Sequence, residues 1–159
     1  ESFKDSGGWQ LDTQFIQIMG SPYLNAHGMG TPVSNAKTTI EAEAGEYRVW
    51  VRTKDWVAHW NAPGTPGRFQ VLVNGKALAN ELGTEGAEWH WQEAGKVTLQ
   101  AGKNDIELKD LTGFNGRCDA IYFTKDMTVK PDNSSDVLSK WRSEKLGLKG
   151  IEEKGPYLL

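Results

Sequence analysis

The chain has 159 residues, of which 38% are hydrophobic and 25% are charged, so its length suits one domain, or one domain with an appendage, that has a substantial core. The formal net charge of −3, with no basic stripe to offset it, argues against a nucleic-acid partner. No apolar run approaches the roughly 20 residues of a membrane helix, and the single cysteine, Cys118, excludes an internal disulfide and a thiolate metal site. Because the sequence begins at Glu1 without a methionine or an apolar leader, we expect a processed or partial chain from which a signal peptide can be missing.

The first 35 residues carry few structural signals. The segment 9–13 can form a strand, and 15–19 is apolar but short. The segment 20–33 is predicted as a loop, with Gly28 and Gly30 on either side of a methionine.

Alternating apolar and polar residues predict β-strands between residues 38 and 124. The clearest strand is 46–53, and the segment 68–73 leads into Asn74-Gly75, a strong signal for a tight hairpin turn. Further strands are predicted at 38–41, 76–79, 88–92, 96–100, 105–108 and 119–124. These strands predict an all-β fold in which two sheets pack face to face as a jelly-roll sandwich.

A helix is predicted after the last strand. Its range is Ser135–Leu146, because a serine can cap its start and Gly147 can end it. We expect its narrow apolar stripe to pack on the sandwich or on a following domain; the stripe consists of Val137, Leu138 and Trp141. The sequence therefore divides into a sandwich at 1–126 and a helix with a linker at 127–159.

The seven tryptophans form two groups. Those on strand or helix patterns are expected in the core or on a sheet face, and they are Trp9, Trp50, Trp89, Trp91 and Trp141. Trp56 and Trp60 lie instead in the segment Asp55–Gly64, which is predicted as a loop. They can fold back over the end of the sandwich, or they can present their rings to a sugar whose hydroxyls His59 and Asn61 bind. Both interpretations are equally open, and one tryptophan can serve each role.

A second candidate for ligand binding is Asn115, which precedes Gly116 in the segment 110–119. At a loop tip, its amide and backbone would both reach a ligand. The alternative interpretation is that Asn115 takes a left-handed turn conformation and has no binding role.

No catalytic or metal site is predicted. The sequence lacks a Gly-x-Ser-x-Gly motif, and no pair of carboxylates stands out for glycoside hydrolysis. His27, His59 and His90 lie far apart, so they would bind a metal only if the fold gathered them. Asp119 is interpreted as a structural hydrogen-bond acceptor or as the partner of an ion pair with Arg117.

Three segments resemble galactose-binding-like β-sandwich modules, a group that includes many carbohydrate-binding modules and the carbohydrate-binding-like domain of xanthan lyase and golvesin-type proteins. The segments are 44–52, 68–75 and 113–124, which carry the patterns G-x-Y-x-V-x-V, V-x-G and D-A-I-x-F. The resemblance covers about residues 1–126 and implies a ligand at the loop end of the sandwich or on its concave face. Some related modules hold a structural calcium ion, for which Glu1 and either Asp119 or Asp126 would be the ligands here.

Four shorter stretches are similar to the module that precedes the flavin domain in secreted bacterial FAD-dependent oxidoreductases. They are Met19–Tyr23, Ala26–Gly28, Trp56–Gly64 and Gly83–Trp91. This resemblance implies that the predicted helix leads through a charged linker into a flavin domain, whose first strand would begin near 155–159. The glycine-rich fingerprint that holds FAD is absent from the sequence, so no redox chemistry is expected in this segment.

The sequence thus predicts a non-catalytic carbohydrate-binding module of a larger secreted or periplasmic protein. Its partner would be a glycan or polysaccharide, with no cofactor apart from a possible calcium ion, and with no nucleic acid or membrane. The predicted ligand-binding residues are Trp56, His59, Trp60, Asn61 and Asn115. The alternative is a structural domain that docks on the flavin domain and binds no free sugar.

Overall fold

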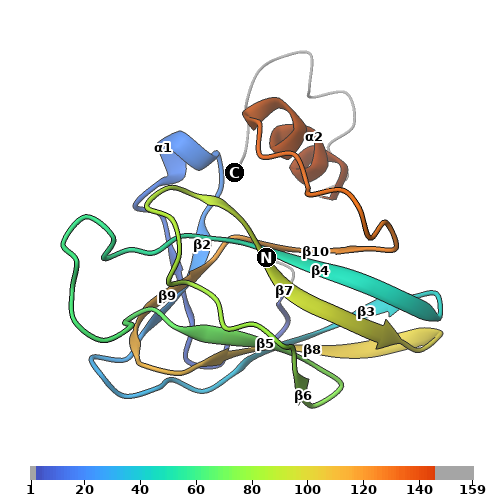
Figure 1. The fold of residues 1–159 in the computed structure, drawn as a ribbon, viewed down its shortest axis with the longest axis horizontal. Helices are drawn as coiled ribbons and strands as arrows, with labels where there is room; N and C mark the ends of the chain where they lie inside the picture. Colours follow the sequence, from blue (N-terminus) through green and yellow to red (C-terminus); the bar gives the residue numbers. More distant parts are fainter. Residues whose placement is uncertain (1–2, 146–159) are drawn as a thin grey trace.

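A computed structural model describes residues 3–145 (Figure 1). In this range the strands are β1 (Gln10–Asp12), β2 (Tyr23–His27), β3 (Ala36–Ala42), β4 (Gly45–Thr53), β5 (Phe69–Val73), β6 (Lys76–Ala77), β7 (His90–Leu99), β8 (Gly102–Asp110), β9 (Phe114–Cys118) and β10 (Ala120–Thr124). The helices are α1 (Ile16–Met19) and α2 (Ser135–Lys145). The strands form antiparallel sheets with the orders β10–β4–β7, β3–β8–β5–β6 and β1–β2–β9.

The main core lies between the β10–β4–β7 and β3–β8–β5–β6 sheets. Val49 and Val51 of β4 are buried in it, together with Leu108 of β8. Trp50, between the two valines, belongs to a separate cluster on the other face of its sheet. This alternation is the period of two expected of a strand. The predicted all-β sandwich with a C-terminal helix is confirmed.

The prediction of a loop at 20–33 is wrong, because this segment contains β2, which pairs with β1 and β9. Tyr23 and Leu24 are both buried, but in different clusters on opposite faces of the strand. A short strand that is buried on both faces shows no alternation in its sequence, so the pattern could not reveal it. The apolar stretch before it forms the single turn α1, which Gly20 ends with a φ of 73°.

The strands predicted at 88–92 and 96–100 form one continuous strand, β7. Gly95 has a φ of 130° and lies opposite an irregularity between Val49 and Trp50 of β4. The glycine therefore marks a bulge inside a strand and not a turn between two strands. The predicted tight turn at Asn74-Gly75 is confirmed, with φ values of 49° and 81° between β5 and β6.

Helix α2 packs against the outer face of the β10–β4–β7 sheet. Leu138 is buried with Trp50 and Trp91, and the ring of Trp141 stacks on Tyr122 with centroids 5.0 Å apart. The apolar stripe of the helix thus packs on the sandwich, which is one of the two positions that the sequence predicted for it. No helix within residues 3–145 is long and apolar enough to cross a membrane. The predicted helix end, the linker and Glu1 lie outside the described residues.

Candidate functional site

The loop between β4 and β5 encloses a small cavity at the end of the sandwich where β4 finishes and β7 begins. The cavity has a volume of about 400 Å³. Three of the predicted residues, Trp56, His59 and Trp60, line it. The other lining residues are Gln14, Phe15, Lys54, Glu88 and Arg117.

Short-range hydrogen bonds fix the path of this loop. The Asp55 carboxylate accepts a hydrogen bond from the backbone N–H of Val57 at 3.0 Å, and the Trp60 N–H donates to the Val57 carbonyl at 2.9 Å. The side chain of Val57 is buried and anchors the turn. These contacts leave Trp60 on the outside of the loop, next to Asn61, whose φ is 46°.

The two loop tryptophans have different environments. The indole N–H of Trp56 donates to the carbonyl of Phe114 at 2.7 Å, and the Arg117 guanidinium lies 5.4 Å from the centre of its ring. Trp60 is 69% exposed and meets Trp56 edge-on, with the ring planes 62° apart. Trp56 therefore forms a wall of the cavity, whereas Trp60 presents a ring to solvent.

The remaining predicted residues lie at different distances from this cavity. His59 lines the cavity, while Asn61 is exposed on the same loop but does not line it. The prediction of a loop tip at Asn115 is wrong, because this residue lies within β9, opposite a register shift in β2. Its φ of 62° agrees with the left-handed alternative, and its amide oxygen lies 2.7 Å from His27 Nδ1.

Two buried cations in the cavity wall did not stand out in the sequence. Lys54 is 8% exposed, and its ammonium group lies 4.5 Å from the centre of the Phe15 ring. Burial lowers the pKa of Lys54, and repulsion from Arg117 lowers it further, while Glu88 acts in the opposite direction. Arg117 is 7% exposed. No local pattern separates either residue from the other lysines and arginines of the sequence.

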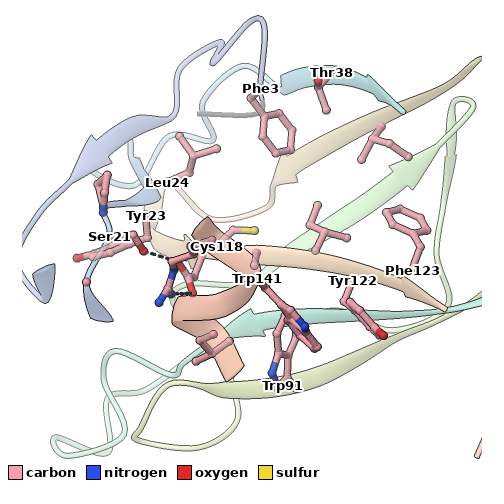
Figure 2. Close-up of a pocket in the computed structure, with 18 of the residues that line it drawn as sticks. Phe3, Ser21, Tyr23, Leu24, Thr38, Trp91, Cys118, Tyr122, Phe123 and Trp141 are labelled. Carbon is pink, nitrogen blue, oxygen red and sulfur yellow. Dashed lines mark hydrogen bonds and ion pairs between the residues drawn. The ribbon is translucent and has the colours of Figure 1, made fainter. Parts of the chain in front are cut away.

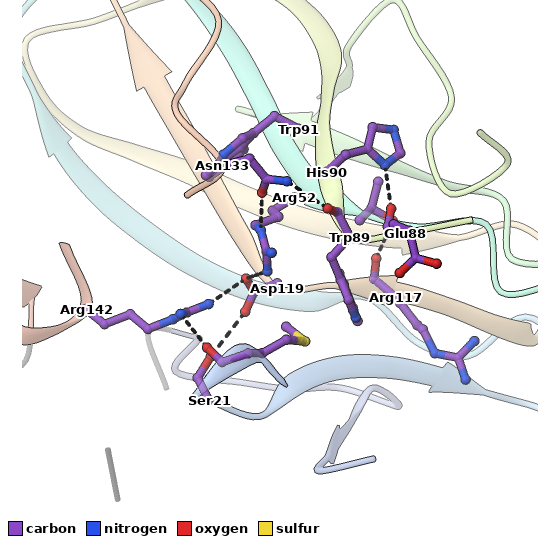
Figure 3. Close-up of polar contacts among 12 residues, drawn as sticks. Ser21, Arg52, Glu88, Trp89, His90, Trp91, Arg117, Asp119, Asn133 and Arg142 are labelled. Atoms are coloured by element: carbon purple, nitrogen blue, oxygen red, sulfur yellow. Dashed lines mark hydrogen bonds and ion pairs between the residues drawn. The ribbon is translucent and has the colours of Figure 1, made fainter. Parts of the chain in front are cut away.

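The interpretation of Asp119 as a structural ion-pair partner and hydrogen-bond acceptor is confirmed, but its partners are two arginines other than Arg117 (Figure 3). Its Oδ2 lies 2.9 Å from Arg52 Nη1 and 3.0 Å from Arg142 Nη2, and its side chain is 3% exposed. Arg52 also donates to Asn133 Oδ1 at 2.8 Å. Figure 3 shows the Arg117 side chain pointing away from this network. The ion pair between Asp119 and Arg142 thus links α2 to the sandwich.

The described residues contain no group of three or more His, Cys, Asp or Glu side chains placed to hold a metal ion. Asp126, one of the two candidate calcium ligands, is exposed and accepts hydrogen bonds from the backbone and hydroxyl of Thr128. The calcium site remains a prediction, because Glu1 lies outside the described residues.

A larger cavity of about 690 Å³ runs between the two main sheets beside β10 and reaches α2 (Figure 2). Its walls carry apolar side chains from both sheets, including Ile40, Ile121 and Phe123. Two of its charged groups, Asp119 and Arg142, bind one another, and a third, Glu144, is exposed. The cavity at the β4–β5 loop is therefore better suited to a polar ligand.

Solved structures with a similar fold were found, although no family model and no curated protein matches the sequence. A family 35 carbohydrate-binding module from Clostridium thermocellum is 20% identical, with a TM-score of 0.56 over 75% of this chain and 89% of that one. The CBM35 from Cellvibrio japonicus Abf62 is 22% identical, with a TM-score of 0.55 over 82% of this chain and 95% of its own. The chain has the fold of a family 35 carbohydrate-binding module.

The same fold occurs inside a larger enzyme. The GH26-CBM35 β-(1,4)-mannanase of Podospora anserina is 20% identical over 82% of this chain, with a TM-score of 0.57. The chain spans only 28% of the length of that mannanase. At these identities the likeness concerns the fold.

Proposed function

We propose that this domain is a non-catalytic carbohydrate-binding module and that the cavity at the β4–β5 loop is its binding site. The observation that carries the proposal is the position of Trp60, a large apolar ring that is 69% exposed beside a cavity with polar groups. An indole face in water gains from stacking on the apolar face of a sugar ring. The fold shared with carbohydrate-binding modules supports this function.

Each loop residue then has a distinct role. Trp60 is the stacking platform, and Trp56 is a wall held in place by its hydrogen bond to Phe114. His59 and Asn61 bind sugar hydroxyls from the rim. Asn115 contributes less, because His27 already engages its amide oxygen. Since a neutral hydrogen bond contributes only about 1 kcal/mol net, the affinity for a single sugar is modest.

The test compares two substitutions of the same chemical kind. Trp60→Ala should abolish retention on immobilised polysaccharides in affinity electrophoresis while the melting temperature changes little. Trp50→Ala is the matched control, because Trp50 is 6% exposed and its loss should cost about 3–5 kcal/mol of folding free energy. Retention that survives Trp60→Ala, or a large loss of stability in that variant, would reject Trp60 as the platform.

The proposal extends to the protein that contains this domain. We infer a larger secreted or periplasmic parent, an FAD-dependent oxidoreductase, in which the domain is an accessory module. The resemblance of Met19–Tyr23 and Gly83–Trp91 to the module that precedes a flavin domain supports this inference. Flavin absorbance in the protein purified from its source organism would test it, and a colourless protein would contradict it.

An alternative function is docking on that flavin domain without sugar binding. Exposed apolar side chains on β1 and α1 favour it, since Leu11 is 60% and Ile18 is 79% exposed. A glycan array and a binding assay with the separate flavin domain distinguish the two functions. Docking predicts no sugar binding and a tight complex that Ile18→Ser weakens.

A further inference from the structure

The exposed ring of Trp60 leans on one neighbouring ring. Of the aromatic rings in residues 3–145, only that of Trp56 contacts it, with the centroids 6.1 Å apart. The backbone of Trp60 is held by its hydrogen bond to the Val57 carbonyl, but most of its side chain lies in solvent. The place of Trp56 therefore determines the angle at which Trp60 meets a ligand.

Trp56 is held closely on the side of its five-membered ring. A Cβ added to Gly67 would lie 2.9 Å from Cδ1 and 3.2 Å from Nε1 of Trp56. Carbon atoms in contact lie about 3.5–4.0 Å apart, so the indole would have to move. The same Cβ would approach the Gly83 carbonyl oxygen to 3.3 Å, so the backbone of Gly67 is itself closely packed. A movement of the indole would disturb its 2.7 Å hydrogen bond to the Phe114 carbonyl.

The side chain of Thr112 joins the two backbone segments that contact Trp56. Its hydroxyl oxygen accepts the N–H of Gly67 and the N–H of Phe114, both at 3.2 Å. Thr112 is itself held by the buried Asp110, whose carboxylate accepts the Thr112 N–H at 3.1 Å. The separation of Gly67 and Phe114, and with it the space for the indole, thus depends on one hydroxyl group.

We propose that Gly67 and Thr112 are positioning residues of the sugar site, which act through Trp56 to set the angle of Trp60. The inference rests on the proposed function and adds to it the residues that orient its stacking platform. Neither Gly67 nor Thr112 lines the cavity, so their effect on a ligand passes through the two tryptophans. Contacts of aromatic rings depend on their geometry, so a tilted Trp60 binds more weakly although the ring is still present.

The first test compares two glycines of the β4–β5 loop. Gly67 and Gly64 have φ values of 90° and 77°, so an alanine introduces backbone strain of the same kind at each. A Cβ at Gly64 meets nothing within 4 Å, whereas a Cβ at Gly67 meets Trp56. In affinity electrophoresis through galactomannan, xylan and pectin gels, Gly67→Ala should weaken binding to the retained polysaccharide about tenfold. Gly64→Ala should leave retention unchanged.

A spectroscopic measurement separates a moved ring from a general loss of stability. Two indoles in edge-on contact couple, and the contribution of this pair to the circular dichroism is the part that Trp60→Ala removes. Gly67→Ala should change this contribution in the folded protein, and Gly64→Ala should preserve it. Melting curves show that each variant is folded at the temperature of the measurement.

Thr112 tests the proposal without adding an atom beside Trp56. Thr112→Val removes the hydroxyl and keeps the shape of the side chain, so affinity should fall about fivefold, the effect of one lost hydrogen bond. Thr112→Ser keeps the hydroxyl and should bind as the original protein does. This pair also decides the matter if Gly67→Ala does not fold.

The negative results are distinguishable. A folded Gly67→Ala that matches Gly64→Ala in retention and in circular dichroism, with Thr112→Val equal to Thr112→Ser, would overturn the positioning role and leave the carbohydrate-binding module standing. If the original protein is retained by none of the three polysaccharides, the proposed function fails. The circular dichroism of the two glycine variants then decides by itself whether Gly67 positions the tryptophan pair.

Discussion

Arg52 and Arg117 are equally buried, at 7% exposure each, yet their surroundings differ. Arg52 lies 2.9 Å from a carboxylate that a second arginine also binds, and its Nε donates to an amide at 2.8 Å. Arg117 has two long hydrogen bonds and one unpartnered nitrogen, with Lys54 as a second cation in the same wall. Two neighbouring regions thus bury positive charge in opposite ways. The satisfied network holds the fold together, whereas Arg117 keeps one buried nitrogen without a partner among the described residues, which is a cost to stability.

The largest effect should come from removing the shared carboxylate. Asp119→Ala leaves the buried Arg52 and the partly buried Arg142 without their shared carboxylate, and we expect the free energy of unfolding to fall by about 3–5 kcal/mol. Urea denaturation measures the loss. Asp126→Ala is the control, because Asp126 is exposed and its side chain accepts hydrogen bonds within its own turn. A loss as small as that of the control would mean that the network does not stabilise the fold.

A smaller effect is expected at the helix side of the same network. Arg142→Met removes one charged hydrogen bond to Asp119 and one to the carbonyl of Met19, and should cost about 1.5–3 kcal/mol. The helix should also become more sensitive to proteolysis than the strands. Lys140→Met, an exposed position on the same helix, should change neither measurement.

The cavity cations should behave in the opposite way. Lys54→Met replaces an unpaired buried charge by an apolar group, so its stability should lie within about 1 kcal/mol of the original protein or above it. A loss of more than about 2 kcal/mol, the size expected for one lost charged hydrogen bond, would mean that Lys54 stabilises the fold as Arg52 does. Urea denaturation of Lys54→Met measures this change. The control is Lys76→Met, because Lys76 is an exposed lysine on β6 that does not line the cavity.

The smallest effect is a dependence on pH. Burial holds the pKa of Lys54 below 10.5 in the folded protein, so the unfolded chain binds more protons in the interval just below that value. The free energy of unfolding contributed by this residue therefore rises with pH across the interval. The free energy of unfolding of the original protein should therefore rise relative to that of Lys54→Met as the pH approaches 10.5. A difference that stays constant would contradict the desolvation of Lys54.

The sequence predicted correctly the strands, turns and helix that are determined by residues close together in the chain. Alternation in 46–53 predicted β4, and the Asn74-Gly75 turn predicted a hairpin whose left-handed backbone the structure contains. The stripe with Leu138 and Trp141 predicted a docked helix. The proline, glycine and asparagine residues around Trp60 predicted a loop, and the side chain of Trp60 is the most exposed of the tryptophans.

The cavity cations could not be predicted, because their burial depends on contacts between distant segments. Arg117 meets Gln14, which is 103 positions away, and Lys54 lies over Phe15. Asp119 lies two positions from Arg117 in the sequence, but it binds arginines from β4 and α2. Sequence proximity suggested the wrong ion pair, because the two side chains point in different directions.

The position of Asp119 also has a mechanical consequence. Only Cys118 separates the residue that fastens α2 from the arginine in the wall of the cavity. A displacement of α2 is therefore transmitted to the wall of the cavity along a backbone path of three residues, in parallel with the packing of Leu138 and Trp141 on the sheet.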